Sequence, residues 1–345
     1  MTKVSIILPT YNSSFFIHEA ISSILKQTHK NLELIIIDDN STDETIKIIK
    51  SFRDQRIRLI VNKKKIGVAS SLNLGIKHSK SKFIARMDSD DISEPNRIEE
   101  QLKFLLKNKK IHVVGTAIKV INEAGIITKF VSYPETSIEI KWSMCLGCSI
   151  VHPSVMMRKY IFEKYGKYRQ TDKIEDYSLW TRLLDKGVKF HNINKYLIRV
   201  RKHSKNSSKI ALLKYQNIEN KIVKRNIFNS TNVQLSEKNN YNLNILRTNN
   251  IYHYNYTLDL IQFLKFIFSQ FCQANKELIS KKILKSLHRS LFEKILIIKI
   301  RSLKNYNNFI HLFFFILINF RFITFLFLKI STNFYKILKS KIIIN

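Results

Sequence analysis

Four short apolar runs, each followed by a polar turn, divide the first hundred residues of the chain. The runs lie at 4–8, 34–37, 58–61 and 83–85. Apolar runs of this length without polar alternation are typical of strands buried on both faces of a parallel sheet. Apolar residues recur at helical spacing between the runs, which predicts helices over 17–25, 41–51 and 67–78. The alternation predicts an α/β fold with a mostly parallel sheet flanked by helices.

Polar clusters follow three of the predicted strands. They are Thr10-Tyr11-Asn12, Asp38-Asp39 and Asp88-Ser89-Asp90. In parallel α/β sheets, ligands bind beyond the carboxyl ends of the strands, so these clusters predict a site at one sheet edge. After the second strand, Ser41-Thr42-Asp43-Glu44 also fits a capping box that would open the next helix.

The segment from Ala85 to Asp91 places three carboxylates within four residues. Such a density of negative charge is costly unless a cation compensates it, and hard divalent ions prefer carboxylate oxygens. A solvated acidic turn is the other reading of the segment alone. The turn after the first strand has neither the glycines of a dinucleotide fold nor the Gly-Lys-Ser/Thr of a phosphate loop. A carboxylate-held metal would therefore neutralise a bound diphosphate, as in a nucleotide-sugar site.

With these features the chain resembles an inverting family 2 glycosyltransferase with the GT-A fold, of the bacterial surface-polysaccharide type. The resemblance runs from residue 3 to about residue 208. The segments that carry it are Ser5–Asn12, Glu19–Ile21, Ser23–Thr28, Glu33–Asp43, Ala85–Asp91 and Glu175-Asp176 with Leu179-Trp180 and Arg182.

The resemblance implies roles for individual residues. The residues that it places at the nucleotide-sugar donor are Pro9, Thr10, Tyr11, Asp39, Arg86 and Asp88. Those that it places at a Mn²⁺ or Mg²⁺ ion are Asp88, Asp90 and His203. Asp39 would accept a hydrogen bond from the base, and Asp176 would be the catalytic base. Direct displacement at an anomeric carbon needs a base on one face and a Lewis acid at the leaving group, which agrees with these roles.

Ordinary structural roles remain open for several of these side chains. Glu175 and Asp176 could be an acidic pair favoured at the start of a helix by its dipole. His203 could be a solvated loop histidine, and His152 could line the site without taking part in the chemistry. Cys145 and Cys148 have Cys-x-x-Cys spacing, but one such pair supplies only half of a zinc site, so reduced thiols are the simpler reading.

The end of the chain differs in composition from the rest. Residues 281–345 contain 13 Lys and Arg against one acid, Glu293, and residues 309–328 contain eight phenylalanines. We expect a catalytic domain over 1–225 and a basic, aromatic-rich helical tail over 226–345 that lies on an anionic membrane surface. A spanning helix and a tail packed on the catalytic domain are alternatives. The net charge of +33 is not assigned to nucleic acid, because no recognition module accompanies it.

These features together predict transfer of one sugar from a nucleotide-sugar, UDP-linked by resemblance, to a glycan or lipid-linked acceptor in surface polysaccharide (LPS or capsule) synthesis. The alternatives are a nucleotidyltransferase and a non-enzymatic basic protein that binds membranes or nucleic acid. Three cysteines and the absence of a secretory leader favour the cytoplasm, with peripheral attachment to the inner face of the cytoplasmic membrane.

Overall fold

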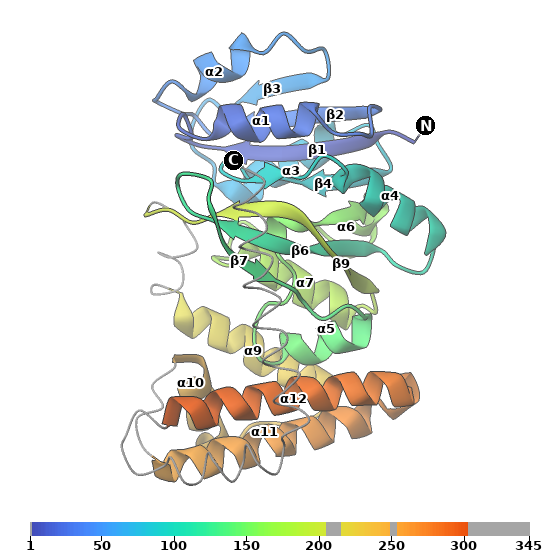
Figure 1. Cartoon of the computed structure of the whole chain (residues 1–345), viewed down its shortest axis with the longest axis vertical. Helices are drawn as coiled ribbons and strands as arrows, with labels where there is room; N and C mark the ends of the chain where they lie inside the picture. Colours follow the sequence, from blue (N-terminus) through green and yellow to red (C-terminus); the bar gives the residue numbers. More distant parts are fainter. Residues whose placement is uncertain (1, 205–214, 249–253, 303–345) are drawn as a thin grey trace. The chain divides into compact units, whose positions relative to one another are not determined.

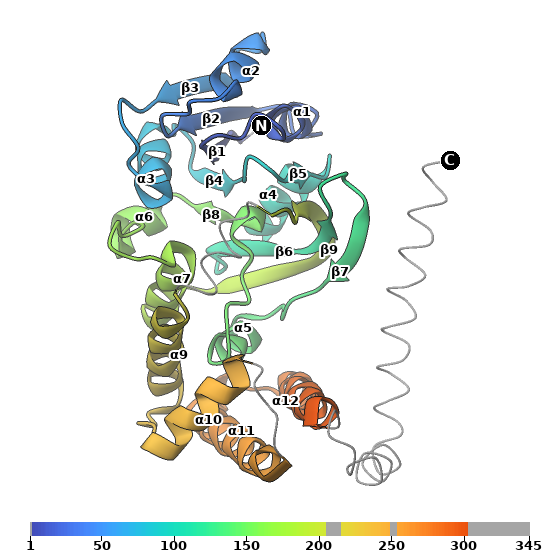
Figure 2. The same cartoon turned by 90° about the vertical axis from the view of Figure 1, so that its left-hand side faces the viewer.

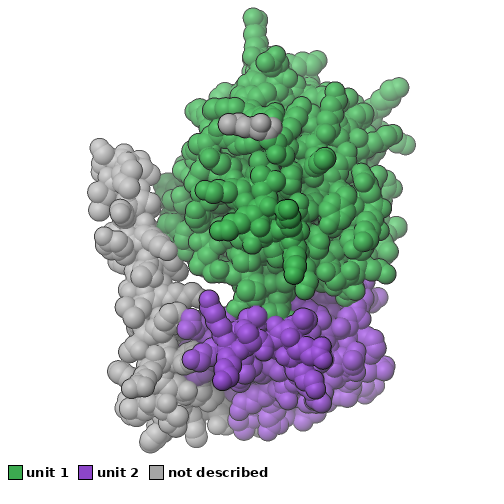
Figure 3. Space-filling view, turned by 90° about the vertical axis from the view of Figure 1, so that its right-hand side faces the viewer, with its two compact units in different colours: residues 1–140, 148–219 green, residues 141–147, 220–345 purple. Residues whose placement is uncertain are grey.

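The computed structural model describes residues 2–204, 215–248 and 254–302, and the chain divides into two compact units. The first unit is Met1–Ile140 with Cys148–Glu219, and the second is Lys141–Gly147 with the chain from Asn220 onward (Figure 3). The expectation that residues 1–225 form the catalytic domain stays a prediction.

The described residues of the first unit form one sheet of nine strands. Their order is β3-β2-β1-β4-β8-β6-β9-β5, with β7 paired to β6. The strands are β1 (Val4–Thr10), β2 (Leu32–Asp38), β3 (Ile57–Val61), β4 (Phe83–Arg86), β5 (Ile92–Ser93), β6 (Val113–Ile121), β7 (Ile127–Val131), β8 (Met156–Arg158) and β9 (Phe190–Arg201). The first four strands of the chain are parallel, as predicted. Beyond β4 the sheet is mixed, because β8 pairs antiparallel with both β4 and β6.

Helices flank this sheet (Figure 1, Figure 2). Within the first unit they are α1 (Ile17–Leu25), α2 (Thr45–Ser51), α3 (Val68–His78), α4 (Arg97–Lys107), η1 (His152–Ser154), α6 (Tyr160–Tyr165) and α7 (Glu175–Asp185). Two more, α5 (Ser137–Met144) and α9 (Gln216–Thr231), begin in the first unit and end in the second. The predicted α/β fold with a flanked sheet is confirmed.

Both faces of the central strands are buried. All seven residues of β1 and of β2 are buried, as the apolar runs predicted. On one face, Leu8 and its neighbours pack with apolar residues of α1 and α4. On the other face α3 approaches so closely that a Cβ on Gly75 would lie 2.5 Å from Cγ2 of Ile7. A glycine is therefore needed where α3 crosses β1.

The predicted capping box before α2 is wrong. The helix begins at Thr45, and its start has no capping bond from Ser41. The Ser41 hydroxyl instead donates to Asp38 Oδ2 at 2.6 Å and accepts from the backbone N–H of Asn12 at 2.9 Å. Asp43 Oδ1 accepts from the backbone N–H of Thr45 at 3.0 Å. Ser41 is therefore used to join two loops at the sheet edge.

The second unit is helical. It contains the end of α9, then α10 (Glu237–Thr248), α11 (Tyr254–Ala274), η2 (Lys276–Leu278) and α12 (Lys281–Ser302). Trp142 explains why residues 141–147 belong to it, since its ring lies 5.2 Å from that of Phe268 and 5.4 Å from that of Phe271. Lys141 Nζ also donates to Asn275 Oδ1 at 2.8 Å.

Within the described part of the chain, every helix is too short or too polar to cross a membrane. The apolar stretch at 309–328, for which a membrane-surface helix was predicted, lies outside the described residues. Attachment to a membrane therefore stays a prediction.

Candidate active site

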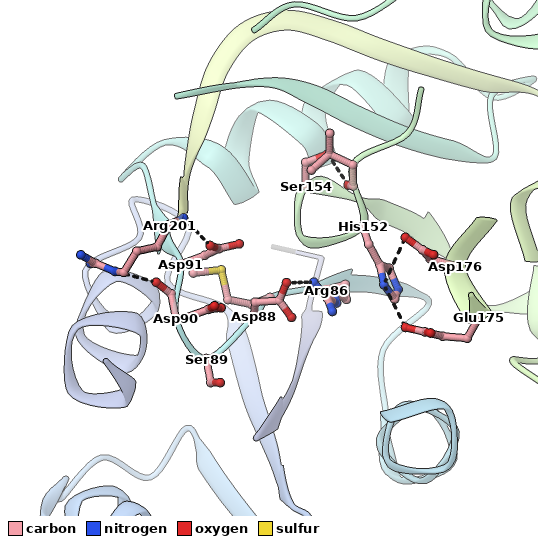
Figure 4. Close-up of polar contacts among 12 residues, drawn as sticks. Arg86, Asp88, Ser89, Asp90, Asp91, His152, Ser154, Glu175, Asp176 and Arg201 are labelled. Carbon is pink, nitrogen blue, oxygen red and sulfur yellow. Dashed lines mark hydrogen bonds and ion pairs between the residues drawn. The ribbon is translucent and has the colours of Figure 1, made fainter. Parts of the chain in front are cut away.

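The acidic segment Asp88–Asp91 joins β4 to β5 at the carboxyl end of the parallel strands. One carboxylate oxygen from each of Asp88, Asp90 and Asp91 lies within 4.8 Å of the other two. The backbone N–H of Met87 donates to Ile7 O at 3.0 Å and fixes the start of the segment on β1. The three carboxylates therefore lie close together, as the sequence predicted (Figure 4).

Arg201, at the end of β9, holds the other end of the segment. Its backbone N–H donates to Asp91 Oδ1 at 2.9 Å, and its Nε donates to the carbonyl oxygen of Asp90 at 2.9 Å (Figure 4). Its guanidinium also pairs with Glu19. Nothing in the sequence distinguishes Arg201 from the other basic residues of its run, so its role was not predicted. Its place at the acidic segment depends on the pairing of β9 with β5 and β6.

Two buried arginines, Arg86 and Arg97, act on the charges of the acidic segment. Asp88 forms an ion pair with the buried Arg86. Burial, together with the neighbouring Asp90, raises the pKa of Asp88, and burial with the neighbouring carboxylates holds the pKa of Asp91 well above its usual range. Asp91 Oδ2 is buried and has no hydrogen-bond partner among the described residues. Three converging carboxylates, one with an unsatisfied buried oxygen, fit a hard divalent cation.

His203 lies beside this cluster. Its Nε2 is 3.0 Å from Asp90 Oδ2, and its ring centroid is 5.1 Å from that of Phe16. The imidazole is therefore held at the acidic segment rather than in a solvated loop. In this position it can either orient Asp90 or approach an ion bound there.

The predicted nucleoside residues lie at the ends of β1 and β2. Pro9 and Thr10 end β1, and the backbone N–H of Asp39 donates to Thr10 O at 2.9 Å. The hydroxyl of Thr10 is buried without a hydrogen-bond partner among the described residues. Tyr11 follows, with 40% of its surface exposed and the Lys65 ammonium 3.4 Å from the centre of its ring.

The Asp39 carboxylate already accepts three hydrogen bonds within the chain. Oδ1 accepts from Asn62 Nδ2 at 2.9 Å and from the backbone N–H of Ile66 at 2.8 Å. Oδ2 accepts from the backbone N–H of Gly67 at 2.8 Å. Asp39 thus holds the loop between β3 and α3, a structural role that its sequence position did not predict. Any hydrogen bond from the nucleobase of a donor would use a remaining lone pair of the Asp39 carboxylate.

A second acidic pair, Glu175 and Asp176, begins α7. Burial, followed by repulsion from Asp176, raises the pKa of Glu175 to about 7, and burial raises the pKa of Asp176. His152 Nδ1 lies 3.9 Å from Glu175 Oε1 and 4.0 Å from Asp176 Oδ2 (Figure 4). Glu175 and Asp176 are therefore not simply a solvent-exposed acidic pair at a helix N-terminus, since they share a buried environment with the imidazole of His152.

Arg86 lies between the two acidic groups in the view of Figure 4. Its positive charge acts on Asp88 on one side and on Glu175 and Asp176 on the other. The structure thus places the predicted Asp88, with Asp90 and His203 beside it, on one side of the buried Arg86 and Asp176 on the other, while Tyr11 and Asp39 lie at the neighbouring strand ends. The arrangement offers a cation site and, separately, a carboxylate able to accept a proton.

Comparison with known proteins agrees with this geometry. Residues 5–166 match the family described as Glycosyl transferase family 2. The chain is 39% identical over 210 residues to EpsE of Bacillus subtilis (strain 168), which covers 59% of this chain and 74% of EpsE. Over 220 residues it is 33% identical to the O-antigen biosynthesis glycosyltransferase WbnJ of Escherichia coli, covering 63% of this chain and 86% of WbnJ.

Another Escherichia coli relative is the UDP-Glc:alpha-D-GlcNAc-diphosphoundecaprenol beta-1,3-glucosyltransferase WfgD, 35% identical over 220 residues, covering 62% of this chain and 83% of WfgD. Among solved structures, S. aureus TarS 1–349 in complex with UDP-GlcNAc has a TM-score of 0.56 at 19% identity, covering 85% of this chain and 88% of that one. The last likeness confirms the GT-A fold. The sequence relatives identify glycosyl transfer, rather than nucleotidyl transfer or simple binding, as the activity. The chain belongs to glycosyltransferase family 2.

Proposed function

We propose that this enzyme transfers one sugar, with inversion, from a UDP-sugar to a lipid-linked glycan acceptor in surface polysaccharide synthesis, and that it uses Mn²⁺ or Mg²⁺. The observation that carries the proposal is the separation of two acidic groups by Arg86. One group brings together the carboxylates of Asp88, Asp90 and Asp91, and the buried Oδ2 of Asp91 has no hydrogen-bond partner among the described residues. The other, Glu175 with Asp176, lies beside a histidine instead.

On the donor side, Asp88, Asp90 and His203 would hold the ion, with the free oxygen of Asp91 as a further ligand. When bound, the ion would supply Lewis-acid stabilisation of the leaving diphosphate. Arg86 would contribute a fixed positive charge to the same group. Pro9, Thr10, Tyr11 and Asp39 would hold the nucleoside at the adjoining strand ends; this list follows the family resemblance and the buried, unpartnered hydroxyl of Thr10.

On the acceptor side, Asp176 would act as the base. The acceptor hydroxyl oxygen forms the new bond to the anomeric carbon, while the bond from that carbon to the diphosphate oxygen breaks and the bonding pair leaves with the nucleoside diphosphate. The hydroxyl proton passes to Asp176. A carboxylate whose pKa is raised by burial is a better proton acceptor near neutral pH than a solvated one.

The acceptor and the location follow from chemistry and from a relative. WfgD, by its name, acts on a diphosphoundecaprenol-linked sugar. A lipid-linked acceptor would confine the reaction to a membrane surface, and the exposed Lys281, Lys282 and Lys285 of α12 carry the charge that an anionic surface attracts. The protein would then work on the cytoplasmic face as a peripheral enzyme, with no role for nucleic acid.

The test begins with a donor screen. Thermal shift and donor hydrolysis would be measured with UDP-glucose, UDP-galactose, UDP-N-acetylglucosamine, GDP-mannose and dTDP-glucose, each with Mn²⁺, with Mg²⁺ and with EDTA. Stabilisation and hydrolysis should require a divalent ion and should be greatest with one of the UDP-sugars. Hydrolysis that is equally fast in EDTA would reject the metal, and preference for a GDP- or dTDP-sugar would reject the assigned nucleotide.

Asp176→Asn tests the base in the same assay. The amide keeps the shape of the side chain but cannot accept the proton, so hydrolysis and transfer should fall on the order of 100-fold or more while donor affinity is unchanged. Asp185→Asn, at the exposed end of the same helix, is the matched control and should behave as wild type. Loss of donor affinity in Asp176→Asn would place that residue in the donor site.

A further inference from the structure

His152 and Tyr168 form a buried hydrogen-bonded pair that faces the second acidic group. His152 Nε2 lies 2.8 Å from the Tyr168 hydroxyl oxygen. The exposed fractions are 6% for His152 and 5% for Tyr168. The other ring nitrogen of His152, Nδ1, lies 3.9 Å from Glu175 Oε1 and 4.0 Å from Asp176 Oδ2. Each nitrogen of the imidazole thus faces a different kind of group.

Both members of the pair are rigidly placed. Asn73 of α3 clamps the backbone of Tyr168, donating from Nδ2 to Tyr168 O at 2.7 Å and accepting from its N–H at 3.2 Å. His152 begins the short helix η1, and its ring packs edge-on to Trp180 at 5.7 Å between centroids. The orientation of the imidazole is therefore set by packing and by the Tyr168 contact together.

The protonation of the pair follows from its surroundings. Burial, with help from Arg86, holds the pKa of His152 well below its usual range, so the ring is neutral and carries one N–H. Burial also raises the pKa of Tyr168, so its hydroxyl keeps the proton. An ionised carboxylate only accepts. When Glu175 and Asp176 are ionised, both contacts of the ring are favourable in one arrangement, in which the tyrosine donates to Nε2 and Nδ1–H faces the carboxylates.

We propose that His152 and Tyr168 are positioning residues for the catalytic base: the tyrosine fixes the Nδ1–H tautomer of His152, and this N–H favours the ionised form of the Glu175–Asp176 pair. The inference rests on the proposed function, in which Asp176 accepts the acceptor's proton. Without the directed N–H the carboxylates would hold their protons to higher pH, and less of the enzyme would carry an ionised base at neutral pH.

The remaining charges around the pair come from several elements. The titratable and charged groups that act on these four side chains are Arg86, Asp88, Cys148 and Glu219. All of them are retained when only Tyr168 or His152 is changed. A difference in pH dependence between such variants and wild type therefore reports the imidazole contact itself.

Nitrogen-15 NMR of histidine-labelled protein reads the tautomer directly. The chain has ten histidines, and the signal of His152 is the one that His152→Asn removes. We expect a neutral Nδ1–H imidazole in wild type and a mixture or the Nε2–H form in Tyr168→Phe. Tyr196→Phe, which removes a hydroxyl 3.1 Å from Ser132 Oγ, is the control and should leave the tautomer unchanged. An Nε2–H ring in the wild-type protein would overturn the proposal.

The pH profile of kcat supplies the functional readout, with the sugar nucleotide that is hydrolysed fastest in the donor screen. In Tyr168→Phe and His152→Leu the acidic limb should move to higher pH by about half a unit to one unit, with donor KM unchanged. His152→Asn should stay near wild type, because its amide N–H takes the place of Nδ1–H.

A packing role alone would lower kcat equally at all pH values, and an unmoved limb in folded Tyr168→Phe and His152→Leu would refute the inference. Native-like histidine spectra of each variant establish that it is folded. If Asp176→Asn keeps full activity, the proposed base is wrong. If Asp176→Asn is inactive while the limb stays in place, only the present inference fails.

Discussion

Replacing Asp90 with asparagine should reverse the order of stability between wild type and variant when metal is added. Three carboxylate oxygens lie within 4.8 Å of one another, so each ionised pair repels by about 3.5 kcal/mol at an effective dielectric constant of about 20. The substitution removes two of the three pairs. The repulsion of these two pairs is an upper bound on the stability gained, because partial exposure and proton uptake relieve part of it. We expect the metal-free variant to gain about 1 to 2 kcal/mol over wild type at mildly alkaline pH.

With metal the order should invert. An ion at about 100 times its Kd stabilises the protein that binds it by about 2.7 kcal/mol, which raises Tm by roughly 5 to 10 °C for a unit of this size. Asp90→Asn loses one charged ligand and should keep only a small part of that gain. Its contacts to the chain are conserved, because an amide can still meet His203 Nε2 and the backbone carbonyl that Arg201 reaches is untouched.

Differential scanning fluorimetry in EDTA and over a Mn²⁺ titration measures both halves of this pattern. Asp185→Asn controls for the loss of one surface charge and should follow wild type throughout. A substitution that simply damages the fold lowers Tm in both conditions and cannot produce a crossing. Parallel Mn²⁺ responses of wild type and Asp90→Asn would show that the acidic segment does not hold the ion, and the reasoning from its geometry would fail.

Three further outcomes are expected. Glu175, with a pKa of about 7 against an ordinary 4.5, stabilises the fold when protonated, so wild type should lose about 2 kcal/mol as pH rises from about 4.5 to about 7, a loss that Glu175→Gln should lack; urea unfolding across that range decides it. Asp39→Ala removes three hydrogen bonds from the 62–67 loop and should cost about 2 to 4 kcal/mol by urea unfolding, with Asp43→Ala as the exposed comparison. Truncation after Ser302 should weaken flotation with anionic vesicles, since the lysines of α12 remain, but leave donor hydrolysis intact, and equal flotation of both proteins would reject the membrane role of residues 303–345.

The parallel half of the fold was predictable because burial on both faces leaves uninterrupted apolar runs. The strands β5 and β8 were not, since they have two and three residues, too few to show a pattern. The position of the carboxylates at Asp88–Asp91 was predictable because they directly follow the apolar run of β4. Arg201 and Tyr168 were not, since their partners lie far away in the sequence and are met only through strand pairing and the clamp from Asn73.

Arg86 connects the two halves of the proposed chemistry. Arg86 is buried, with a relative exposure of 7%; its guanidinium pairs with Asp88 and acts electrostatically on both Glu175 and Asp176. A buried cation is costly unless anions surround it, and Arg86 has acidic groups on two sides. If a divalent ion compensated the charge of Asp88, more of the Arg86 charge would be available to a bound diphosphate and to the proposed base. Arg86 would then couple loading of the donor with readiness of the carboxylate proposed to accept the proton.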